Sequence, residues 1–342
     1  MKICHVNLAT GFSGGEQQTL LLIEQQRTLG YELTVVGARG SPFVERSRAL
    51  GCDDVVETSH FLLGHRRRTT EGVHTIHVHE GRAVYWALLQ HLLFGTPFLI
   101  TRRIDNPLKH KFLLDLAYRR ACHVVGLSRA IQSEIQKTHP GRFVEIIPSS
   151  PRSYPVDAAN LEGLTQRYAG KFVVLQAAKF HAHKGHEVSI AAARQLSAAH
   201  PDIHFCLLGD GPELEPIKAL ATDLDNVSFP GQQGNMGDWF ALADILIHPS
   251  HSEGLGSVIL EANRAGLPVI ATRAGGIPDI VSDGVNGLLI PAGDAPALAN
   301  AITKLHDQPE LCAAMAKNAV QFVSQFEIEQ TARKYQALYE AT

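Results

Sequence analysis

The sequence has few cysteines, and no two of them stand close together. There are five, an odd number, and no Cys-x-x-Cys pair occurs among them. A disulfide framework and a zinc ribbon both need paired cysteines, so neither is indicated. Unpaired cysteines are typical of a reducing compartment, and we expect a cytoplasmic protein. The five positions are Cys4, Cys52, Cys122, Cys206 and Cys312.

A long uninterrupted hydrophobic run is also absent. Residues 83–100 are nearly free of charge, but His91 and the Gly95-Thr-Pro97 break interrupt them. This stretch therefore predicts a buried helix followed by a strand, and no transmembrane span. The N-terminal residues begin a strand pattern directly and lack the apolar core of a signal peptide, which again favours the cytoplasm, with peripheral contact at the inner membrane face left open.

Neither sign of charge dominates, but the charge is unevenly distributed. The 342 residues include 31 Lys and Arg and 34 Asp and Glu, a net charge of −3. Residues 1–150 carry 18 basic and 13 acidic side chains, a balance of +5, and the remainder carries 13 and 21, a balance of −8. A basic N-terminal half favours an anionic partner there, such as a phosphorylated acceptor or a lipid surface, although ordinary solvated charge explains it equally well. The acidic total and the missing aromatic platform argue against nucleic acid.

Short β-rich runs alternate with longer helical patterns, which is typical of parallel sheets built from βαβ units. The length suits two domains. Prolines and serines crowd the segment after residue 148, where the alternation stops, and indicate a linker. We therefore predict an α/β fold with Rossmann-like domains at 1–150 and 171–326, a linker at 151–170 and a terminal helix at 327–342. The predicted strands are 2–8, 32–36, 75–79, 98–101, 123–126, 144–147, 172–177, 203–208, 227–229, 245–248, 268–271 and 287–290.

The segment 248–271 carries the most informative motif. A predicted strand ends at its start, the following loop carries Glu253 and two glycines, and the next helix carries Glu261. Open parallel sheets bind ligands at the carboxyl ends of their strands, so we expect the amides of residues 254–257 to face a ligand. The two glutamates can then contact one ligand at different depths, although such a pair alone also occurs on ordinary surfaces.

This Glu-x7-Glu motif, set between His248-Pro-Ser and Gly266-Leu-Pro-Val-Ile-Ala-Thr, resembles the signature of the retaining glycosyltransferase family 4, which has the GT-B fold. Gly209-Asp-Gly-Pro, Ala274-Gly-Gly-Ile-Pro and the glycine-rich turn at residues 10–16 are further matches, so the resemblance covers nearly the whole chain. It implies two Rossmann-like domains facing each other across a cleft and a C-terminal helix that packs back on the N-terminal domain. It also implies retaining transfer of a sugar from a nucleotide diphosphate to an acceptor hydroxyl.

The resemblance assigns the residues of the donor site. Glu261 is expected to bind the ribose hydroxyls, and Lys179 and Lys184 to stabilise the departing diphosphate. The family normally has arginine where Lys179 stands, and lysine keeps the charge but loses the bidentate geometry. The sugar hydroxyls are assigned to Glu253 and to the backbone amides of Gly254, Leu255 and Gly256.

The acceptor is expected at the first domain, beside Gly14, Gly15 and His79. His79 follows a predicted strand, where the family often has a histidine that contacts the transferred sugar. We expect His77 to face the opposite way and to be a satisfied core residue. The chain departs from many relatives at Pro148-Ser-Ser, where they carry Pro-Asn-Gly.

A metal site is not expected. His181, His183 and His186 can offer nitrogens on one side, but they lie where the family places its phosphate-binding loop, and the Asp-x-Asp-like fragments are weak. No cofactor is predicted beyond the nucleotide-sugar donor.

Several alternatives remain. The donor sugar is expected to be a UDP-hexose or UDP-N-acetylhexosamine, with GDP-mannose as the second choice. The acceptor is expected to be a glycan or glycolipid, such as a bacterial lipopolysaccharide core. A nucleotide-sugar-binding protein without activity and a GT-B epimerase or phosphorylase also fit the motifs. An NAD-dependent dehydrogenase is disfavoured because the first glycine-rich turn is not Gly-x-Gly-x-x-Gly.

Overall fold

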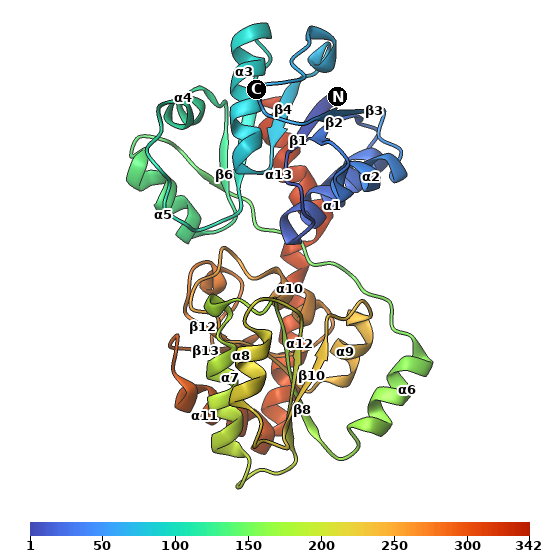
Figure 1. Cartoon of the computed structure of the whole chain (residues 1–342), viewed down its shortest axis with the longest axis vertical. Helices are drawn as coiled ribbons and strands as arrows, with labels where there is room; N and C mark the ends of the chain where they lie inside the picture. Colours follow the sequence, from blue (N-terminus) through green and yellow to red (C-terminus); the bar gives the residue numbers. More distant parts are fainter. The chain divides into compact units, whose positions relative to one another are not determined.

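The computed structural model describes all 342 residues, which divide into two compact units. The first unit comprises Met1–Ser150 and Phe326–Thr342, and the second comprises Pro151–Gln325. Each is a parallel sheet with helices packed on its faces (Figure 1). None of the helices combines the length and the apolar composition that crossing a bilayer requires. The predicted α/β class with two Rossmann-like domains is confirmed.

The sheet of the first unit has seven parallel strands in the order β3-β2-β1-β4-β5-β6-β7. The strands are β1 (Lys2–Asn7), β2 (Glu32–Ala38), β3 (Asp54–Thr58), β4 (Thr75–Val78), β5 (Phe98–Arg102), β6 (Val124–Gly126) and β7 (Glu145–Ile146). The helices are α1 (Gly14–Thr28), α2 (Pro42–Ala49), α3 (Gly81–Phe94), α4 (Phe112–Arg120), α5 (Arg129–Thr138) and α13 (Ile328–Glu340). The strand order reverses between β1 and β4, and ligands bind outside such a switch point in open α/β sheets.

The sheet of the second unit has six parallel strands in the order β10-β9-β8-β11-β12-β13, with its switch point between β8 and β11. The strands are β8 (Phe172–Ala177), β9 (Ile203–Leu208), β10 (Val227–Gly231), β11 (Ile245–His248), β12 (Val269–Thr272) and β13 (Gly287–Ile290). The helices are α6 (Ala158–Arg167), α7 (His186–Leu196), α8 (Leu214–Leu220), α9 (Met236–Leu242), α10 (Ser257–Arg264), α11 (Ala295–Asp307) and α12 (Pro309–Val323).

Local sequence explains where the helices begin and end. The Ser128 hydroxyl accepts a hydrogen bond from the Ile131 amide and caps α5, and Asp294 caps α11 through the amide of Ala297. Gly95 ends α3 in the left-handed conformation, which glycine adopts without a steric cost. The stretch 83–100 therefore forms a helix and a strand, as predicted.

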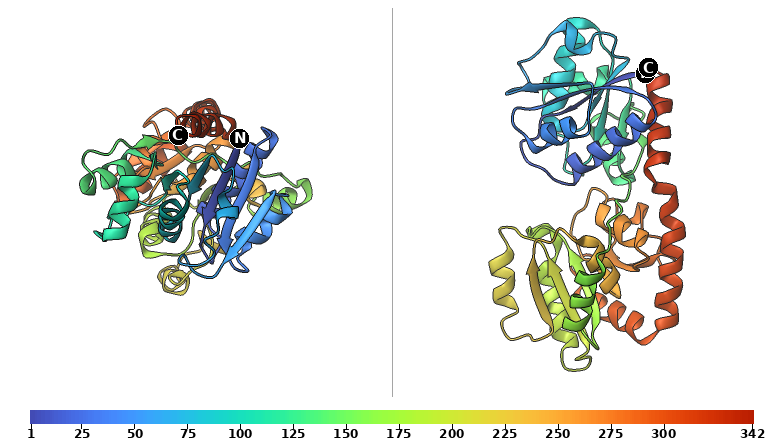
Figure 2. Two further views of the ribbon diagram at one scale, coloured as in Figure 1. Left: turned by 90° about the horizontal axis from the view of Figure 1, so that it is seen from above. Right: turned by 90° about the vertical axis from the view of Figure 1, so that its right-hand side faces the viewer.

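The C-terminal helix α13 packs against α1 in the first unit (Figure 2). Its side chains Ala332, Tyr335 and Tyr339 join the core cluster that includes Leu20 and Ile23 of α1. Tyr339 is fully buried. The last residues of the chain therefore complete the core that its first residues begin.

The segment 151–170, predicted as a linker, contains helix α6 and is part of the second unit. The Asp157 carboxylate caps this helix by accepting from the amides of Ala159 and Asn160, and α6 packs against α9. The predicted bounds of the linker, 151–170, therefore include a helix that belongs to the second unit. The sequence did not predict α6, because none of its side chains is buried and the helix therefore lacks a marked apolar face.

Candidate functional site

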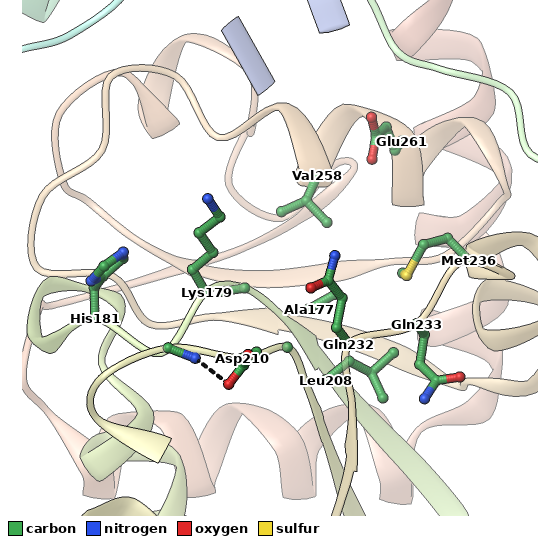
Figure 3. Close-up of a pocket in the computed structure, with 13 residues that line it drawn as sticks. Ala177, Lys179, His181, Leu208, Asp210, Gln232, Gln233, Met236, Val258 and Glu261 are labelled. Atoms are coloured by element: carbon green, nitrogen blue, oxygen red, sulfur yellow. Dashed lines mark hydrogen bonds between the residues drawn. The ribbon is translucent and has the colours of Figure 1, made fainter. Parts of the chain in front are cut away.

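A cavity of about 550 Å³ lies at the carboxyl ends of β8 and β9 in the second unit (Figure 3). Lys179 follows β8, the Gly209-Asp-Gly turn follows β9, and Glu261 reaches the cavity from α10. Gln232, Gln233 and Met236 close the side beyond β10. The volume falls in the range of pockets for nucleotide-sized ligands.

Glycines allow the turn after β9 to pack closely against the loop after β8 beneath the cavity. Gly209 has a φ of +138°, and a Cβ there would lie 2.0 Å from the carbonyl oxygen of Ala178. A Cβ at Gly211 would lie 2.5 Å from the carbonyl oxygen of Phe180. The turn after β9 and the loop after β8 are therefore in contact, and only glycine fits at these positions.

The Glu261 carboxylate is partly buried and accepts a hydrogen bond from the Tyr154 hydroxyl at 3.2 Å. Burial raises the pKa of Glu261 to about 7, although the Tyr154 hydrogen bond and the charge of Arg152 act in the opposite direction. The group therefore changes its charge near neutral pH.

Glu253 is held quite differently. Its Oε2 lies 2.5 Å from the Lys184 ammonium and 2.9 Å from Nε2 of His248, at the end of β11. Burial alone would raise the pKa of Glu253, but the hydrogen bond and charge of His248, together with the Lys184 ammonium, outweigh it and lower the pKa to about 2. Glu253 is therefore an anion under all ordinary conditions.

The loop after Glu253 leads into the N-terminus of α10. Gly256 precedes the helix with a φ of +91° and provides no side-chain cap, so the first amides of α10 lack a capping side chain. Helix N-terminal amides attract anions and hydroxyl oxygens. The Leu255 side chain is buried, so only its backbone can face a ligand.

The predicted donor residues thus fall into two groups. Lys179 and Glu261 line the cavity, whereas Lys184 and Glu253 form an ion pair with each other and do not line it. Gly256 lies beside the second group, since a Cβ there would lie 3.4 Å from Cγ of Glu253. Whether these residues bind a ligand in the predicted roles stays a prediction.

The first unit has a cavity of about 260 Å³ at the carboxyl ends of β4 and β5. Gly15, Glu16, His79, Glu80 and Arg103 are among its lining residues, and Gly14 is the first residue of α1 beside them. Glu80 caps α3 by accepting from the amides of residues 82 and 83.

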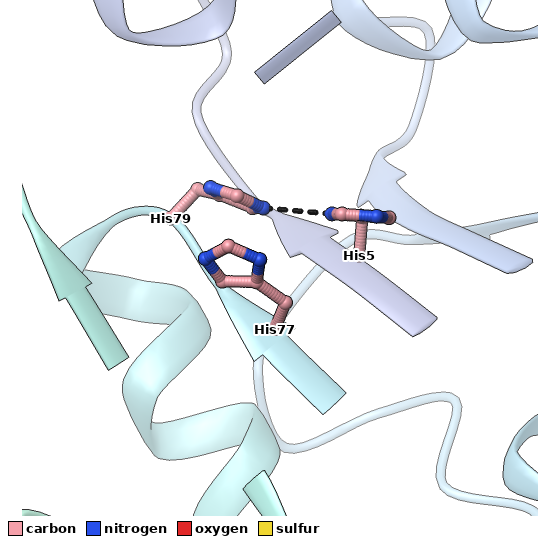
Figure 4. A group of neighbouring side chains, drawn as sticks. All are labelled: His5, His77 and His79. Carbon is pink, nitrogen blue, oxygen red and sulfur yellow. Dashed lines mark hydrogen bonds between the residues drawn. The ribbon is translucent and has the colours of Figure 1, made fainter. Parts of the chain in front are cut away.

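Three buried histidines lie beside this cavity (Figure 4). The rings of His77 and His79 are 3.9 Å apart, and His5 Nδ1 lies 2.9 Å from Nε2 of His79. The expectation that His77 faces away from His79 is wrong, because residues two apart in a strand project from the same face. His77 is nevertheless a hydrogen-bonded core residue, as expected.

Burial keeps these histidines neutral. It lowers the pKa of His5 to about 4, and it lowers the pKa of His77 and His79 well below the usual value, with repulsion between the rings and from Arg103 adding to the effect. The Arg103 guanidinium donates to Nδ1 of His79 at 3.3 Å.

Two histidine groups are relevant to metal binding. The ring nitrogens of His5, His77 and His79 lie within 4.8 Å of one another, a spacing that a metal ion requires. In the segment noted in the sequence, by contrast, His181 and His183 stack at 5.8 Å, while His186 is buried against the Phe180 ring.

Sequence reasoning missed several residues of these sites. His5, Gln26 and Tyr339 surround His77 and His79, and Tyr154 contacts Glu261. These side chains belong to distant segments and to no motif. The sequence placed His5, Gln26 and Tyr339 only in a strand or in helices, and it placed Tyr154 only in the linker. The two histidines at positions 77 and 79 were the only local signal for a polar cluster.

Comparison with known proteins connects this geometry to a family. Residues 163–322 match the family described as glycosyl transferases group 1. The chain is 32% identical over 216 residues to the lipopolysaccharide core biosynthesis glycosyltransferase LpsE of Rhizobium meliloti (strain 1021), which covers 61% of this chain and 59% of LpsE. It is 25% identical over 358 aligned positions to the lipopolysaccharide core biosynthesis mannosyltransferase LpsB of the same organism, covering 98% and 96% of the two chains.

The fold is shared with solved structures. Anabaena HepE, whose crystal structure contains UDP and glucose, aligns over 100% of both chains with a TM-score of 0.86 and 22% sequence identity. The second unit contains the residues that match the glycosyl transferases group 1 family, and both units align with HepE. The chain therefore has the GT-B fold, and its residues 163–322 match the glycosyl transferases group 1 family.

Proposed function

We propose that this protein is a retaining glycosyltransferase that moves a hexose or N-acetylhexosamine from a UDP-sugar to an acceptor hydroxyl. The cavity of the second unit carries this proposal, because a cation, a carboxylate and glycine turns meet there at the carboxyl ends of parallel strands. The match of the same unit to glycosyl transferases group 1 supports it.

In this proposal each residue that binds the nucleotide sugar has one role. Glu261 accepts hydrogen bonds from the ribose hydroxyls, and Lys179 places its ammonium beside the diphosphate. The anionic Glu253, held by Lys184, accepts from the sugar hydroxyls near the amides of α10. Pre-placed donors at a leaving group stabilise developing charge without reorganisation, which is a large contribution to catalysis.

The reaction keeps the configuration at the anomeric carbon. The bond from that carbon to the phosphate oxygen breaks, and the bond to the acceptor oxygen forms on the same face. The acceptor proton passes to the departing phosphate oxygen. No protein carboxylate has to form a covalent intermediate, in contrast with the usual retaining glycosidase.

The acceptor is proposed to bind the cavity of the first unit, with Gly14, Gly15 and His79 beside it. Arg103 supplies positive charge there and can meet an anionic group of the acceptor, while Glu16 and Glu80 in the same cavity can accept from its hydroxyls. A surface glycan such as a lipopolysaccharide core fits this chemistry, and LpsE and LpsB act in the biosynthesis of that core.

A screen of nucleotide sugars tests the proposal. We expect UDP-sugars to raise the melting temperature and, with a glycan acceptor, to release UDP. The alternative donor, GDP-mannose, would instead produce the larger shift. Binding without UDP release by any acceptor would indicate a nucleotide-sugar-binding protein, and conversion of the donor sugar alone would indicate an epimerase.

Two variants locate the sites. Glu261→Ala is expected to abolish donor binding, whereas His79→Ala should leave donor affinity unchanged and lower turnover. Calorimetric titration with UDP and measurement of UDP release separate the two effects. Full turnover in both variants would show that these cavities are not the site.

A further inference from the structure

A continuous chain of side-chain hydrogen bonds leads from the cavity of the first unit into its core. It begins at Arg103, which donates to Nδ1 of His79, and continues from Nε2 of His79 to Nδ1 of His5 at 2.9 Å. His5 Nε2 then contacts Oε1 of Gln26 at 2.7 Å, and the Gln26 amide nitrogen donates to the Tyr339 hydroxyl at 3.0 Å.

The second half of this hydrogen-bond chain runs from Tyr339 to residues of strands β4 and β5. The Tyr339 hydroxyl lies 2.7 Å from Nδ1 of His77, and His77 Nε2 lies 2.8 Å from the Thr101 hydroxyl. Thr101 in turn contacts the Tyr335 hydroxyl at 3.0 Å. Every ring nitrogen of the three histidines therefore has one protein partner.

The chemistry of arginine determines the direction of this chain. A guanidinium group has donors only, so Nδ1 of His79 must accept and its Nε2 must carry the proton of the neutral ring. Nδ1 of His5 then accepts and its Nε2–H donates to Gln26. The opposite direction would place an N–H of His79 against an N–H of Arg103.

We propose that His5, Gln26 and Tyr339 are positioning residues that hold His79 in its Nε2–H tautomer, so that Nδ1 keeps its lone pair for the Arg103 guanidinium at the cavity. The inference rests on the proposed function in one respect, namely that a sugar or acceptor binds in this cavity. It then specifies the ligand group at Arg103, which is a hydrogen-bond-accepting oxygen, because the guanidinium that His79 orients can only donate.

The same histidines are close enough together to hold a divalent metal ion. A metal would take nitrogens that are already engaged, since it would break the bond between His5 and His79 and the bonds of His77 to Tyr339 or Thr101. Buried polar groups without partners are costly, so the hydrogen-bonded arrangement is favoured.

The test uses two tyrosines on one helix. Tyr339→Phe removes the hydroxyl that joins Gln26 to His77. The Gln26 side-chain amide is then free to rotate by 180° and exchange its oxygen and nitrogen positions. Tyr335→Phe, one turn earlier on α13, removes a hydroxyl beyond Thr101 at the far end of the chain. Both side chains are buried, with exposed fractions of 0% and 2%, so the two substitutions are matched in size and burial.

The primary measurement is histidine ¹⁵N NMR on the full chain, with the His79 signal assigned from a His79→Gln variant. We expect a single Nε2–H tautomer of His79 in the wild type and in Tyr335→Phe, and a mixture in Tyr339→Phe. A wild-type Nδ1–H tautomer, equal changes in both tyrosine variants or displacement of the ring protons by added Zn²⁺ would each overturn the proposal.

Kinetics provide the second measurement. Loss of one neutral hydrogen bond in the chain should lower kcat of Tyr339→Phe about fivefold, with KM for the nucleotide sugar unchanged and Tyr335→Phe within about twofold of wild type. A raised KM with unchanged kcat would contradict a role through His79. The NMR result does not depend on turnover, so an inactive wild type would refute the proposed function while leaving the tautomer assignment testable.

Discussion

The two units place a histidine at the same point of two similar sheets, and its surroundings make the two sites different. His79 follows β4 and His248 ends β11, and each of these strands lies next to the switch point of its sheet. His79 is bound to a neutral histidine and an arginine, whereas His248 is bound to the carboxylate of Glu253, which also pairs with Lys184.

The comparison shows two ways to hold a polar side chain beneath a cavity. The first unit uses a chain of neutral side chains that begins at the Arg103 guanidinium, and this chain fixes where protons are. The second unit uses an ion pair with side chains only 17% and 16% exposed, which fixes where charge is. The ion pair keeps Glu253 anionic, as its proposed role toward the sugar hydroxyls requires, and the neutral chain keeps His79 uncharged beside Arg103.

The largest effect is expected when the charged arrangement is broken. Lys184→Met leaves the Glu253 carboxylate buried without its cation, which should cost about 3–5 kcal/mol of unfolding free energy. Turnover should fall about 10²- to 10³-fold, because Glu253 is no longer held in place. Urea unfolding and UDP release measure the two effects.

Lys218→Met is the matched control. Lys218 pairs with Glu215 one helical turn away, and both side chains are well exposed, so its loss should change stability by less than about 0.5 kcal/mol. Equal destabilisation by the two substitutions would mean that burial of the Lys184–Glu253 pair is unimportant.

A smaller effect is expected when the backbone beneath Glu253 is changed. Gly275 has a φ of +52°, and a Cβ there would lie 1.9 Å from the carbonyl oxygen of Glu253. Gly275→Ala should therefore destabilise the second unit by about 3 kcal/mol, from strain and displacement of the loop. Gly284→Ala, at a φ of +77° with no atom within 4 Å of a Cβ, should cost only about 1 kcal/mol. Similar thermal unfolding of both variants would show that the loop yields freely.

The smallest effect is expected from pH, which should change the charge of Glu261 but not that of Glu253. Glu261, with its pKa raised to about 7, is mostly protonated at pH 6 and mostly charged at pH 8. A carboxylate that accepts from ribose hydroxyls must be charged, so affinity for UDP should rise by about tenfold from pH 6 to pH 8. Calorimetric titration across this range measures it, and Glu261→Gln, which cannot titrate, should remove this rise. Glu253, with its pKa lowered to about 2, contributes nothing to it.

Much of the fold could be predicted from local patterns. Apolar runs bounded by turns located β8, β9, β11 and β13 at their observed bounds, because buried parallel strands are continuous in apolar character. Helix α6 could not be predicted in this way, since it buries no side chain and its stability comes from a cap and from contact with α9.

The candidate sites could also be predicted only in part. The Glu-x7-Glu spacing predicted that Glu253 and Glu261 share one region, but it did not predict their opposite pKa shifts. Burial raises the pKa of Glu261, whereas His248 and the distant Lys184 lower that of Glu253. The error over His77 had a simpler cause, since the alternation of side chains along a strand was applied to residues two apart.

By itself the sequence determined two parallel sheets, their glycine turns and the identity of the side chains at the strand ends, because these depend on residues near one another in the chain. Only the tertiary structure decided the charge and proton positions of those side chains. A carboxylate or an imidazole takes its charge from burial and from its neighbours, and Tyr339 reaches His77 across a sequence separation of 262.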